Sequence, residues 1–303
     1  MAWKETDIGD LSGRRFLITG ANSGIGWEAA RSLAEHGATV VLGGRTAAKC
    51  SDAEQRIRLT VPDARLEHFV AELGDLSSVR AAVDQLSEQP IDVLINNAGV
   101  MAIPRRETVD GFEMQLGVNH LAHFALTGLM VERLADGGRV VHVSSNAHKM
   151  GRMNWPDLMH QKSYERWTAY GQSKLAQLLF HKELQRRFDA EGRGRVSVGC
   201  HPGYSATNLV FKGPEYDQRP WLRPLFSAGN ALFAQSARAG AWPTLFAATS
   251  TDVRGGEYIG PSGMFELWGT PTPVRSKRKA NNPEDAARLW DTSADLTGVR
   301  YLD

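Results

Sequence analysis

The chain has 303 residues, with 35 Lys and Arg against 34 Asp and Glu, and 42% of its residues are hydrophobic. This composition excludes disordered chains, which combine low hydrophobicity with high net charge, and strongly basic nucleic-acid-binding domains. Its two cysteines are too few for a disulfide scaffold or a cysteine-rich zinc site, which favours a cytoplasmic protein. We expect no membrane span, because no apolar run reaches roughly 18 residues, and the polar N-terminus is unlike a signal peptide.

Short β-type runs alternate with helical stretches along most of the chain. Strands are expected at 16–19, 39–42, 66–70, 93–96, 140–144, 196–200 and 258–259. Helices are expected at 25–36, 47–59, 76–86, 111–133 and 170–188. Continuous rather than alternating apolar runs are typical of strands buried on both faces of a parallel sheet. The pattern therefore predicts an α/β fold, a single Rossmann-type doubly wound parallel sheet of about seven strands with helices on both faces.

A glycine-rich turn joins the first expected strand to the first expected helix. The glycines suit a tight turn, a close approach of backbone to a pyrophosphate and close helix packing, and the helix N-terminus offers free N–H groups to phosphates. The spacing G-x-x-x-G-x-G differs from the G-x-G-x-x-G fingerprint, and a turn without a ligand is the alternative. The position between a strand and a helix favours a dinucleotide. The binding residues expected in this turn are Gly20, Asn22, Ser23, Gly24, Ile25 and Gly26.

Arg45 follows the second expected strand directly after two glycines. An acidic residue in this region would hold the ribose 2′-OH of NAD, whereas a guanidinium pairs with a 2′-phosphate through two hydrogen bonds. Arg45 therefore predicts NADP(H) rather than NAD(H) as the cofactor. A solvated surface arginine is the alternative.

Five further motifs follow the glycine-rich turn in chain order. They are Asn96-Asn97-Ala98-Gly99, Asn119, Ser144-Ser145, Tyr170 with Lys174, and Pro202-Gly203. With them, the chain resembles the short-chain dehydrogenase/reductase superfamily over about residues 11–260. The Gly-Arg after the second strand, the helix at 119–124 and the long interval between Ser145 and Tyr170 most resemble the retinol-dehydrogenase-like group. Protochlorophyllide reductases share much of this layout, so their activity stays an alternative.

The resemblance implies an oxidoreductase that interconverts a carbonyl and an alcohol by hydride transfer, with Ser145, Tyr170, Lys174 and Asn119 as its catalytic residues. Tyr170 would be the general acid for reduction and the general base for oxidation. Because Lys174 lies one helical turn later, its ammonium is expected to lower the pKa of the tyrosine hydroxyl. Ser145, rather than Ser144, would hydrogen-bond the substrate oxygen, and Asn119 would anchor a proton-relaying water.

The same resemblance implies cofactor contacts outside the glycine-rich turn. They are Asn97, Ala98 and Gly99 on the adenosine side, with Tyr170, Lys174, Pro202, Gly203 and Thr207 on the nicotinamide side. Two candidates compete for the position of the family's aspartate beside the adenine, namely Glu72-Leu73 and Asp75-Leu76. We favour Glu72 and Leu73, because Glu72 comes sooner after the third strand.

Other polar clusters predict no further chemistry. His120 and His123 lie one helical turn apart, but no third ligand has the usual spacing, so we expect core or surface histidines and no metal site. Cys200 is expected to be buried. We expect one NAD(P)-binding domain over 1–303, with a substrate lid or insertion at about 204–239 and a C-terminal extension after about 261.

Loops at the carboxyl ends of the strands are expected to select the substrate. The segments 101–106, 150–167 and 204–233 contribute Met150, Met153, Trp155, Tyr204, Phe211, Trp221 and Phe226. A mostly apolar lining suits a small hydrophobic carbonyl or alcohol, with lid packing within the protein as the alternative. No nucleic-acid partner is expected, and the family often forms homo-oligomers through the helices near Asn119 and Tyr170.

A protein of another class could share this fold. The alternative function is a non-catalytic NADP(H)-binding redox sensor or regulator, whose known examples typically lose the tyrosine or the lysine. Tyr170 and Lys174 are both present here. A methyltransferase on a similar sheet is disfavoured, because these two residues would have no role in it.

Overall fold

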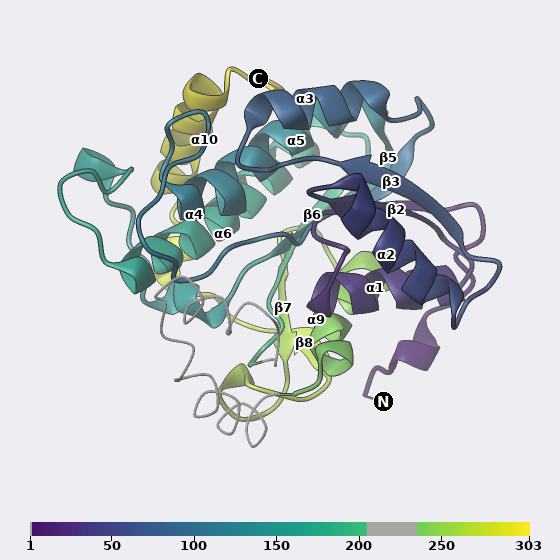
Figure 1. Ribbon diagram of the computed structural model, residues 1–303. Coiled ribbons are helices and arrows are strands. Elements are labelled where there is room, and N and C mark those ends of the chain that lie inside the picture. Colours follow the sequence, from purple (N-terminus) through teal and green to yellow (C-terminus); the bar gives the residue numbers. More distant parts are fainter. Residues whose placement is uncertain (1, 205–234) are drawn as a thin grey trace, which may run out of the picture.

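The computed structural model describes residues 2–204 and 235–303, in which one sheet of eight strands lies between two layers of helices (Figure 1). The strands are β1 (Arg15–Ile18), β2 (Thr39–Gly44), β3 (Arg65–Val70), β4 (Ile91–Asn96), β5 (Leu134–Val143), β6 (Val196–Cys200), β7 (Tyr258–Pro261) and β8 (Pro271–Pro273). Their order in the sheet is β3-β2-β1-β4-β5-β6-β7-β8. The expected doubly wound parallel fold is confirmed, and β8, which pairs antiparallel with β7, adds a strand to the expected number.

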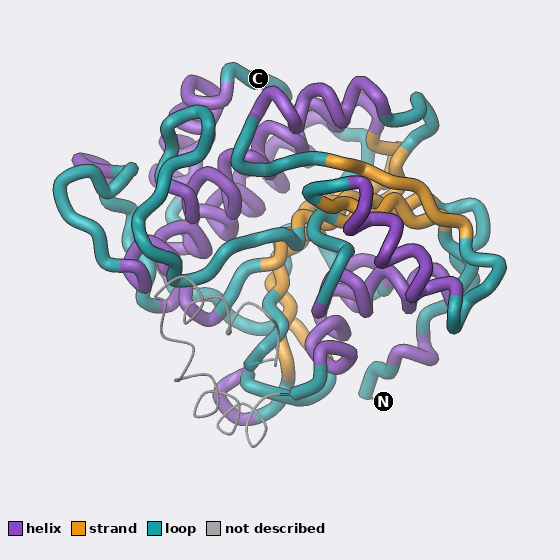
Figure 2. Tube along the Cα trace, in the orientation of Figure 1, coloured by secondary structure: helices purple, strands orange, loops and turns teal. Residues whose placement is uncertain are grey.

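The helices divide between the two faces of the sheet. They are α1 (Gly24–Glu35), α2 (Ala47–Arg58), α3 (Leu76–Gln85), α4 (Met114–Leu116), α5 (Ala122–Met130), α6 (Arg166–Glu191), α9 (Ala237–Thr249) and α10 (Pro283–Thr297). Side chains from α1, α2 and α9 share one apolar core with one face of the sheet. Side chains from α3, α5, α6 and α10 share the other core with the opposite face. Figure 2 shows the strands as the layer between these two groups.

The first strand illustrates why a parallel sheet forms. Successive side chains of a strand point to opposite faces, so both faces of β1 are apolar. Phe16 and Ile18 enter the core beneath α1, and Leu17 enters the core beneath α5. Leu17 pairs in register with Val41 of β2 and Leu94 of β4. A strand that buries both faces is stable only in the middle of a sheet covered by helices.

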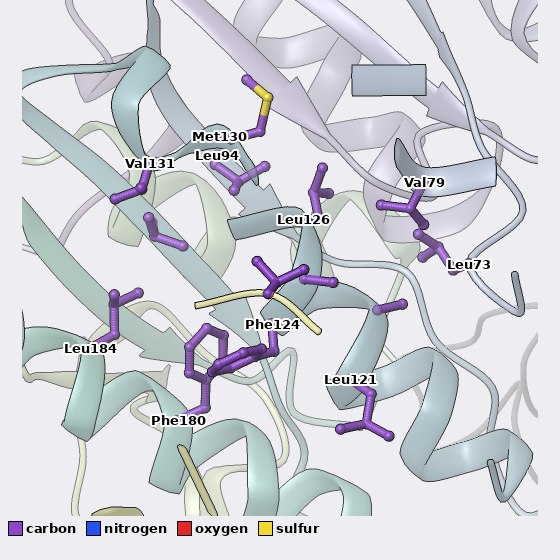
Figure 3. Packing of buried hydrophobic residues seen from close by; sticks show 14 of the residues in the cluster. Leu73, Val79, Leu94, Leu121, Phe124, Leu126, Met130, Val131, Phe180 and Leu184 are labelled. Atoms are coloured by element: carbon purple, nitrogen blue, oxygen red, sulfur yellow. The ribbon is translucent and has the colours of Figure 1, made fainter. Parts of the chain in front are cut away.

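An aromatic cluster ties α10 to the core beneath α5 and α6. The ring of Trp290 lies 5.1 Å from that of Phe124 and 5.8 Å from that of Phe180, measured between ring centroids. Tyr301 closes the cluster at 4.7 Å from Trp290. Figure 3 shows Phe124 and Phe180 side by side among the aliphatic residues of this core. Helix α10 and the residues that follow it thus pack on α5 and α6.

The helix expected at 111–133 is present over 114–133, and it contains a π-turn that the prediction did not include. Helix α4 is followed by a π-helical segment, η2 (Gly117–Leu121), before α5 begins. A π-turn widens the helix by one residue and is often found at functional sites. It turns the side chain of Asn119 toward the loop after β4, where Asn119 bonds to Val100.

The sheet order places a crevice at the carboxyl ends of β1 and β4. The chain proceeds from β1 to β2 and β3 in one direction and from β4 to β5, β6 and β7 in the other. Loops diverge at such a switch point, and ligands of open α/β sheets bind there. Of the expected insertion at 204–239, residues 205–234 lie outside the described residues. Among the helices of residues 2–204 and 235–303, none combines the length and the apolar character needed to cross a membrane.

Candidate active site

A cavity of about 1330 Å³ opens at the carboxyl ends of the central strands. It is lined by all the expected cofactor residues that the structure describes, which are Gly20, Asn22, Ser23, Gly24, Ile25, Gly26, Arg45, Glu72, Leu73, Asn97, Ala98, Gly99, Tyr170, Lys174, Pro202 and Gly203. Thr207 lies outside the described residues. The fold thus brings residues that follow five different strands, together with two residues of α6, to one cavity.

The glycines at 20 and 26 are required by geometry. Gly20 has a φ of +68°, in the left-handed region that favours glycine. A Cβ atom at Gly26 would collide with the carbonyl oxygen of Gly20 and with the side-chain amide of Asn97. The turn, the first helix and the loop after β4 are therefore packed against one another without room for a side chain.

The first turn of α1 keeps its backbone donors uncapped. Ser23 occupies the N-cap position, but its side chain makes no capping hydrogen bond. At six other described α-helices the N-cap side chain accepts such a bond from a backbone N–H, and these N-cap residues are Thr46, Asp75, Glu113, Glu165, Ser236 and Asn282. The free N–H groups and the positive end of the helix dipole favour an anion at this place. The residues present therefore fit the pyrophosphate of a dinucleotide.

Thr19 connects the glycine-rich turn to the loop after β4, and the sequence pattern did not single it out. Its hydroxyl accepts hydrogen bonds from the backbone N–H of Asn97 at 2.9 Å and of Ala98 at 3.0 Å. The side-chain amide of Asn97 donates to the carbonyl of Thr19 at 2.7 Å. The two loops that would enclose the adenosine half of a cofactor are thus joined. The sequence feature that could have indicated this role is the position of Thr19 directly before Gly20, at the end of the first strand.

Glu72, rather than Asp75, faces the cavity. Its Oε1 accepts the backbone N–H of Gly74 at 3.0 Å, and its Oε2 lies 3.9 Å from Nη1 of Arg45. Both side chains of this pair are about half exposed. Asp75 instead caps α3, where its carboxylate accepts the N–H of Ser77 at 2.9 Å. The position of Glu72 is consistent with the preferred assignment, and its contact with adenine stays a prediction.

Helix α6 carries Tyr170 and Lys174 to the edge of the cavity. Tyr170 is buried, and its hydroxyl adjoins the side chain of Ser145 in the loop after β5. The Nζ of Lys174 lies 5.7 Å from the centroid of the Tyr170 ring. It donates to the carbonyl of Val143 at 3.0 Å and to Oε1 of Gln177 at 2.9 Å. Ser145, Tyr170 and Lys174 therefore form one cluster between β5 and α6.

Burial controls the charges of this cluster. It raises the pKa of Tyr170 to about 12, although the neighbouring Ser145 side chain acts in the opposite direction. Burial also lowers the pKa of Lys174 to about 7. The expected lowering of the tyrosine pKa by Lys174 is therefore wrong, because the cost of desolvating the phenolate is larger. Tyr170 carries its proton at neutral pH, which is the form a general acid needs.

The structure distinguishes the two adjacent serines. The hydroxyl of Ser144 is buried and donates to the carbonyl of Lys174 at 2.8 Å. The Oγ of Ser145 accepts the N–H of Ala147 at 3.2 Å and contacts Tyr170. Ser145 is therefore the serine whose side chain adjoins Tyr170, and its catalytic role stays a prediction.

Asn119 stands behind the cavity wall. Its side-chain oxygen accepts the N–H of Val100 at 2.8 Å, and its amide donates to the Val100 carbonyl at 2.9 Å and to Ser173 at 2.9 Å. These contacts link the loop after β4 to α6. The water-anchoring role of Asn119 stays a prediction, since this side chain is bonded to protein groups.

Comparison with known proteins identifies the family. The short chain dehydrogenase family matches residues 14–215. The chain belongs to this family. Human retinol dehydrogenase 12 is 39% identical over 297 residues, which cover 96% of this chain and 88% of that protein. Retinol dehydrogenase 14 from Mus musculus is 38% identical over 309 residues, which cover 97% of this chain and 88% of that protein. This short-chain dehydrogenase is thus an oxidoreductase of the retinol-dehydrogenase-like group.

Solved structures of short-chain dehydrogenases share its fold. A crystal structure of an uncharacterized protein from Mycobacterium paratuberculosis is 42% identical and has a TM-score of 0.82, with 99% of each chain covered. A gluconate 5-dehydrogenase from Burkholderia cenocepacia, solved in complex with NADP and tartrate, is 26% identical with a TM-score of 0.60. That match covers 82% of this chain and 93% of the other.

The cavity lining of this dehydrogenase also contains apolar side chains outside the expected cofactor residues. They are Met101, Ala102, Ile103, Met150, Trp167 and Tyr204, and the same loops contribute the polar residues Arg106, Glu107, Thr108, Asn146 and Arg166. The ring of Trp167 meets that of Tyr170 edge to face, with 6.2 Å between their centroids. Apolar walls around a few polar groups suit a hydrophobic substrate.

Two residues expected near the substrate lie elsewhere. Met153 is buried in the core between the sheet and α6. The Nε1 of Trp155 donates to Asp285 at 2.9 Å, and the guanidinium of Arg288 stacks over its ring. These side chains therefore bind α10 to the loop before α6. Phe211, Trp221 and Phe226 lie outside the described residues.

The histidines of the central helix have protein partners. The Nε2 of His120 lies 2.8 Å from the hydroxyl of Ser293, and the Nε2 of His123 lies 3.0 Å from that of Thr19. In the part of the chain that the structure describes, no three His, Cys, Asp or Glu side chains gather as a metal site would require. Burial raises the pKa of Cys200 to about 12, so this thiol is not activated as a nucleophile.

Proposed function

We propose that this short-chain dehydrogenase uses NADP(H) to interconvert a carbonyl and an alcohol on a small hydrophobic substrate. The observation that carries the proposal is the cluster of Ser145, Tyr170 and Lys174 at the junction of two parts of one cavity. On one side lie the uncapped helix N-terminus and the glycine-rich turn. On the other side lies the apolar lining around Trp167.

Arg45 supports a preference for the phosphorylated cofactor. It stands where the 2′ position of the adenosine ribose is expected, and its nearest acidic neighbour is Glu72, at 3.9 Å. A separation of 3.9 Å between half-exposed groups is a weak interaction, so the guanidinium remains available to a phosphate. The NADP in the gluconate 5-dehydrogenase structure supports the same choice.

Each residue of the cluster has a separate role in the proposed carbonyl reduction. The nicotinamide, when bound, supplies the hydride. Ser145 would donate a hydrogen bond to the substrate oxygen and stabilise the charge that develops on it. Tyr170 holds the proton that this oxygen needs, because its pKa of about 12 keeps the hydroxyl protonated. Lys174 would orient the nicotinamide ribose.

The proposed substrate class rests on the residues that line the cavity and on the names of the two retinol dehydrogenase relatives. The described wall beside Tyr170 offers thioether, aliphatic and indole surfaces. Both relatives described above are named retinol dehydrogenases. A hydrophobic aldehyde, with all-trans-retinal as the first compound to test, is therefore the substrate class that we expect.

The test measures the consumption of NADPH in the presence of a panel of hydrophobic aldehydes and ketones. The reaction is monitored by the absorbance of the reduced nicotinamide. We expect turnover with the wild-type protein, and the Tyr170→Phe variant should lower kcat by roughly 100-fold or more, the usual contribution of a general acid. The variant should still bind NADPH, because the other cofactor contacts remain and the phenyl ring retains the packing against Trp167.

A non-catalytic NADP(H) sensor would give the opposite result. It would bind NADPH, but would turn over no compound of the panel and would be unaffected by Tyr170→Phe. Equal affinity for NADP and NAD, measured by calorimetry, would contradict the assignment of Arg45.

A further inference from the structure

The loop between β7 and β8 (residues 262–270) contacts two segments of the active site. It holds the segment after Ser145, since the side-chain amide of Asn146 donates to the carbonyl of Phe265 at 3.5 Å. It also holds the turn after β6, because the N–H of Tyr204 donates to the carbonyl of Leu267 at 2.9 Å. No sequence motif singled out this loop.

Glu266 is the charged residue of the loop that faces both segments. Its Oε2 accepts a hydrogen bond from Nζ of Lys149 at 3.0 Å, and Lys149 lies in the short helix that begins directly after Ser145. The same oxygen lies 3.1 Å from Nε2 of His201, the residue before Pro202. The contacts with His201 and Lys149 lower the pKa of Glu266 to about 2, so its carboxylate is charged.

The contact with His201 extends to the turn on the nicotinamide side. The backbone N–H of Gly203 donates to Nδ1 of His201 at 3.2 Å. This bond makes Nδ1 an acceptor, so the proton of the neutral imidazole resides on Nε2, the nitrogen that lies 3.1 Å from Glu266. Gly203 has a φ of +68°, and a Cβ atom there would lie 2.9 Å from Pro261. The imidazole thus transmits the position of Glu266 to this turn.

The backbone of the loop is shaped to present this carboxylate. Phe265 and Glu266 have φ values of +54° and +58°, in the left-handed region that residues with a Cβ atom rarely adopt. Such strain persists where the surroundings determine the conformation, and it is concentrated at functional sites. The ring of Phe265 is 75% exposed, so packing of this ring does not account for the conformation.

We propose that Glu266 is a positioning residue, which holds the Ser145 segment and the Pro202–Gly203 turn at a set distance through Lys149 and His201. The inference rests on the proposed function, in which Ser145 meets the substrate oxygen and the turn meets the nicotinamide. Glu266 touches neither reactant. Its contribution is the relative placement of the two groups between which the hydride moves.

The variants Glu266→Gln and Glu266→Ala test the proposal, with Glu284→Gln as the matched control. Glu284 is an exposed carboxylate in the first turn of α10. The first measurement is hydrogen exchange of the cofactor-free proteins. We expect faster exchange in both 146–151 and 201–204 for the two Glu266 variants, and no change for the control. The glutamine keeps the shape of the side chain and tests the charge alone.

The second measurement separates the two halves of the cofactor. Affinity for 2′,5′-ADP, which lacks the nicotinamide, should be unchanged in the Glu266 variants. Affinity for NADPH should fall by roughly tenfold, the effect of losing about one hydrogen bond at the nicotinamide turn. Where the wild-type protein turns over an aldehyde, kcat should fall by about 100-fold, as expected for a misplacement near 1 Å.

Two results would overturn the proposal. One is exchange that accelerates only within 262–270. The other is an unchanged ratio of NADPH to 2′,5′-ADP affinity in both variants. Failure of the proposed function would look different. The wild-type protein would then turn over no aldehyde, while hydrogen exchange in the Glu266 variants would still be faster in both 146–151 and 201–204. A double variant that combines Glu266→Ala with Lys149→Met adds a check. Its loss of NADPH affinity, as a free energy, should be smaller than the sum of the losses in the two single variants, because the two residues contact each other.

Discussion

Mild acid should destabilise this protein strongly, because several histidines are buried as neutral rings. Burial lowers the pKa of His120 and His181 to about 3, and of His123 and His148 to about 4. It also holds the pKa of His142 well below its usual range. The ring of His142 lies 4.9 Å from Phe180, and among residues 2–204 and 235–303 neither of its nitrogens has a hydrogen-bond partner.

The direction in which pH changes the free energy of unfolding follows from which state binds more protons. Between pH 6.5 and about 4 the unfolded chain protonates these histidines, whereas the folded protein does not, so stability falls as the pH falls. Each histidine then costs about 1 kcal/mol between pH 6.5 and 5.5, and five cost about 5 kcal/mol. Domains are typically stable by about 5–15 kcal/mol, so this loss is a large part of the total.

The assay combines urea unfolding, followed by tryptophan fluorescence at pH 7.5, 6.5 and 5.5, with the proton uptake on unfolding. We expect an uptake of about four protons at pH 5.5 from these five side chains. The variant His142→Leu should take up about one proton fewer and should lose less stability in acid. Phe180→Leu is the control, because it disturbs the same contact without removing a titrating group. It should lower stability at every pH and leave the uptake unchanged.

A free energy of unfolding that stays constant from pH 7.5 to 5.5 would refute the reasoning. An uptake below one proton would do the same, since it would mean that the buried rings are already charged in the folded protein.

Three further substitutions test the fold and the cofactor site. Arg45→Gln should weaken NADPH binding by roughly 10- to 100-fold, the value of a charge-assisted hydrogen bond, and leave NADH binding unchanged in calorimetry. Gly26→Ala should cost about 1–3 kcal/mol of stability and weaken cofactor binding, because its Cβ collides with Gly20, whereas Gly9→Ala, with nothing within 4 Å, should do neither. Trp290→Ala should cost about 3–5 kcal/mol in urea unfolding, since its ring packs between Phe124 and Tyr301.

Local patterns were sufficient for much of the fold and of the candidate site. A strand, a glycine-rich turn and a helix adjacent in sequence also lie adjacent in space, so the turn at 20–26 could be predicted from its residues. Tyr170 and Lys174 are neighbours for the same reason, because residues four apart meet on one side of a helix. Buried strands were predicted from their composition, since only apolar side chains tolerate burial on both faces.

The choice between Glu72 and Asp75 needed the tertiary structure. Both follow β3 within a few residues, and the start of α3 decides which carboxylate is used as its cap. The π-turn at Asn119 was also missed, because an amphipathic pattern cannot register one inserted residue inside a helix.

The motifs by themselves predicted many of the residues that line the cavity and the order in which the chain supplies them, although Thr19 was missed and Asn119 lies behind the cavity wall. Only the tertiary structure decided their charge and their spacing. The pKa of Tyr170 depends on how completely the surrounding elements remove water, and helical proximity to Lys174 predicted the wrong direction. The contacts of Glu266 with Lys149 and His201 join three loops far apart in the sequence. Such contacts depend on the packing of the whole fold, which no local pattern encodes.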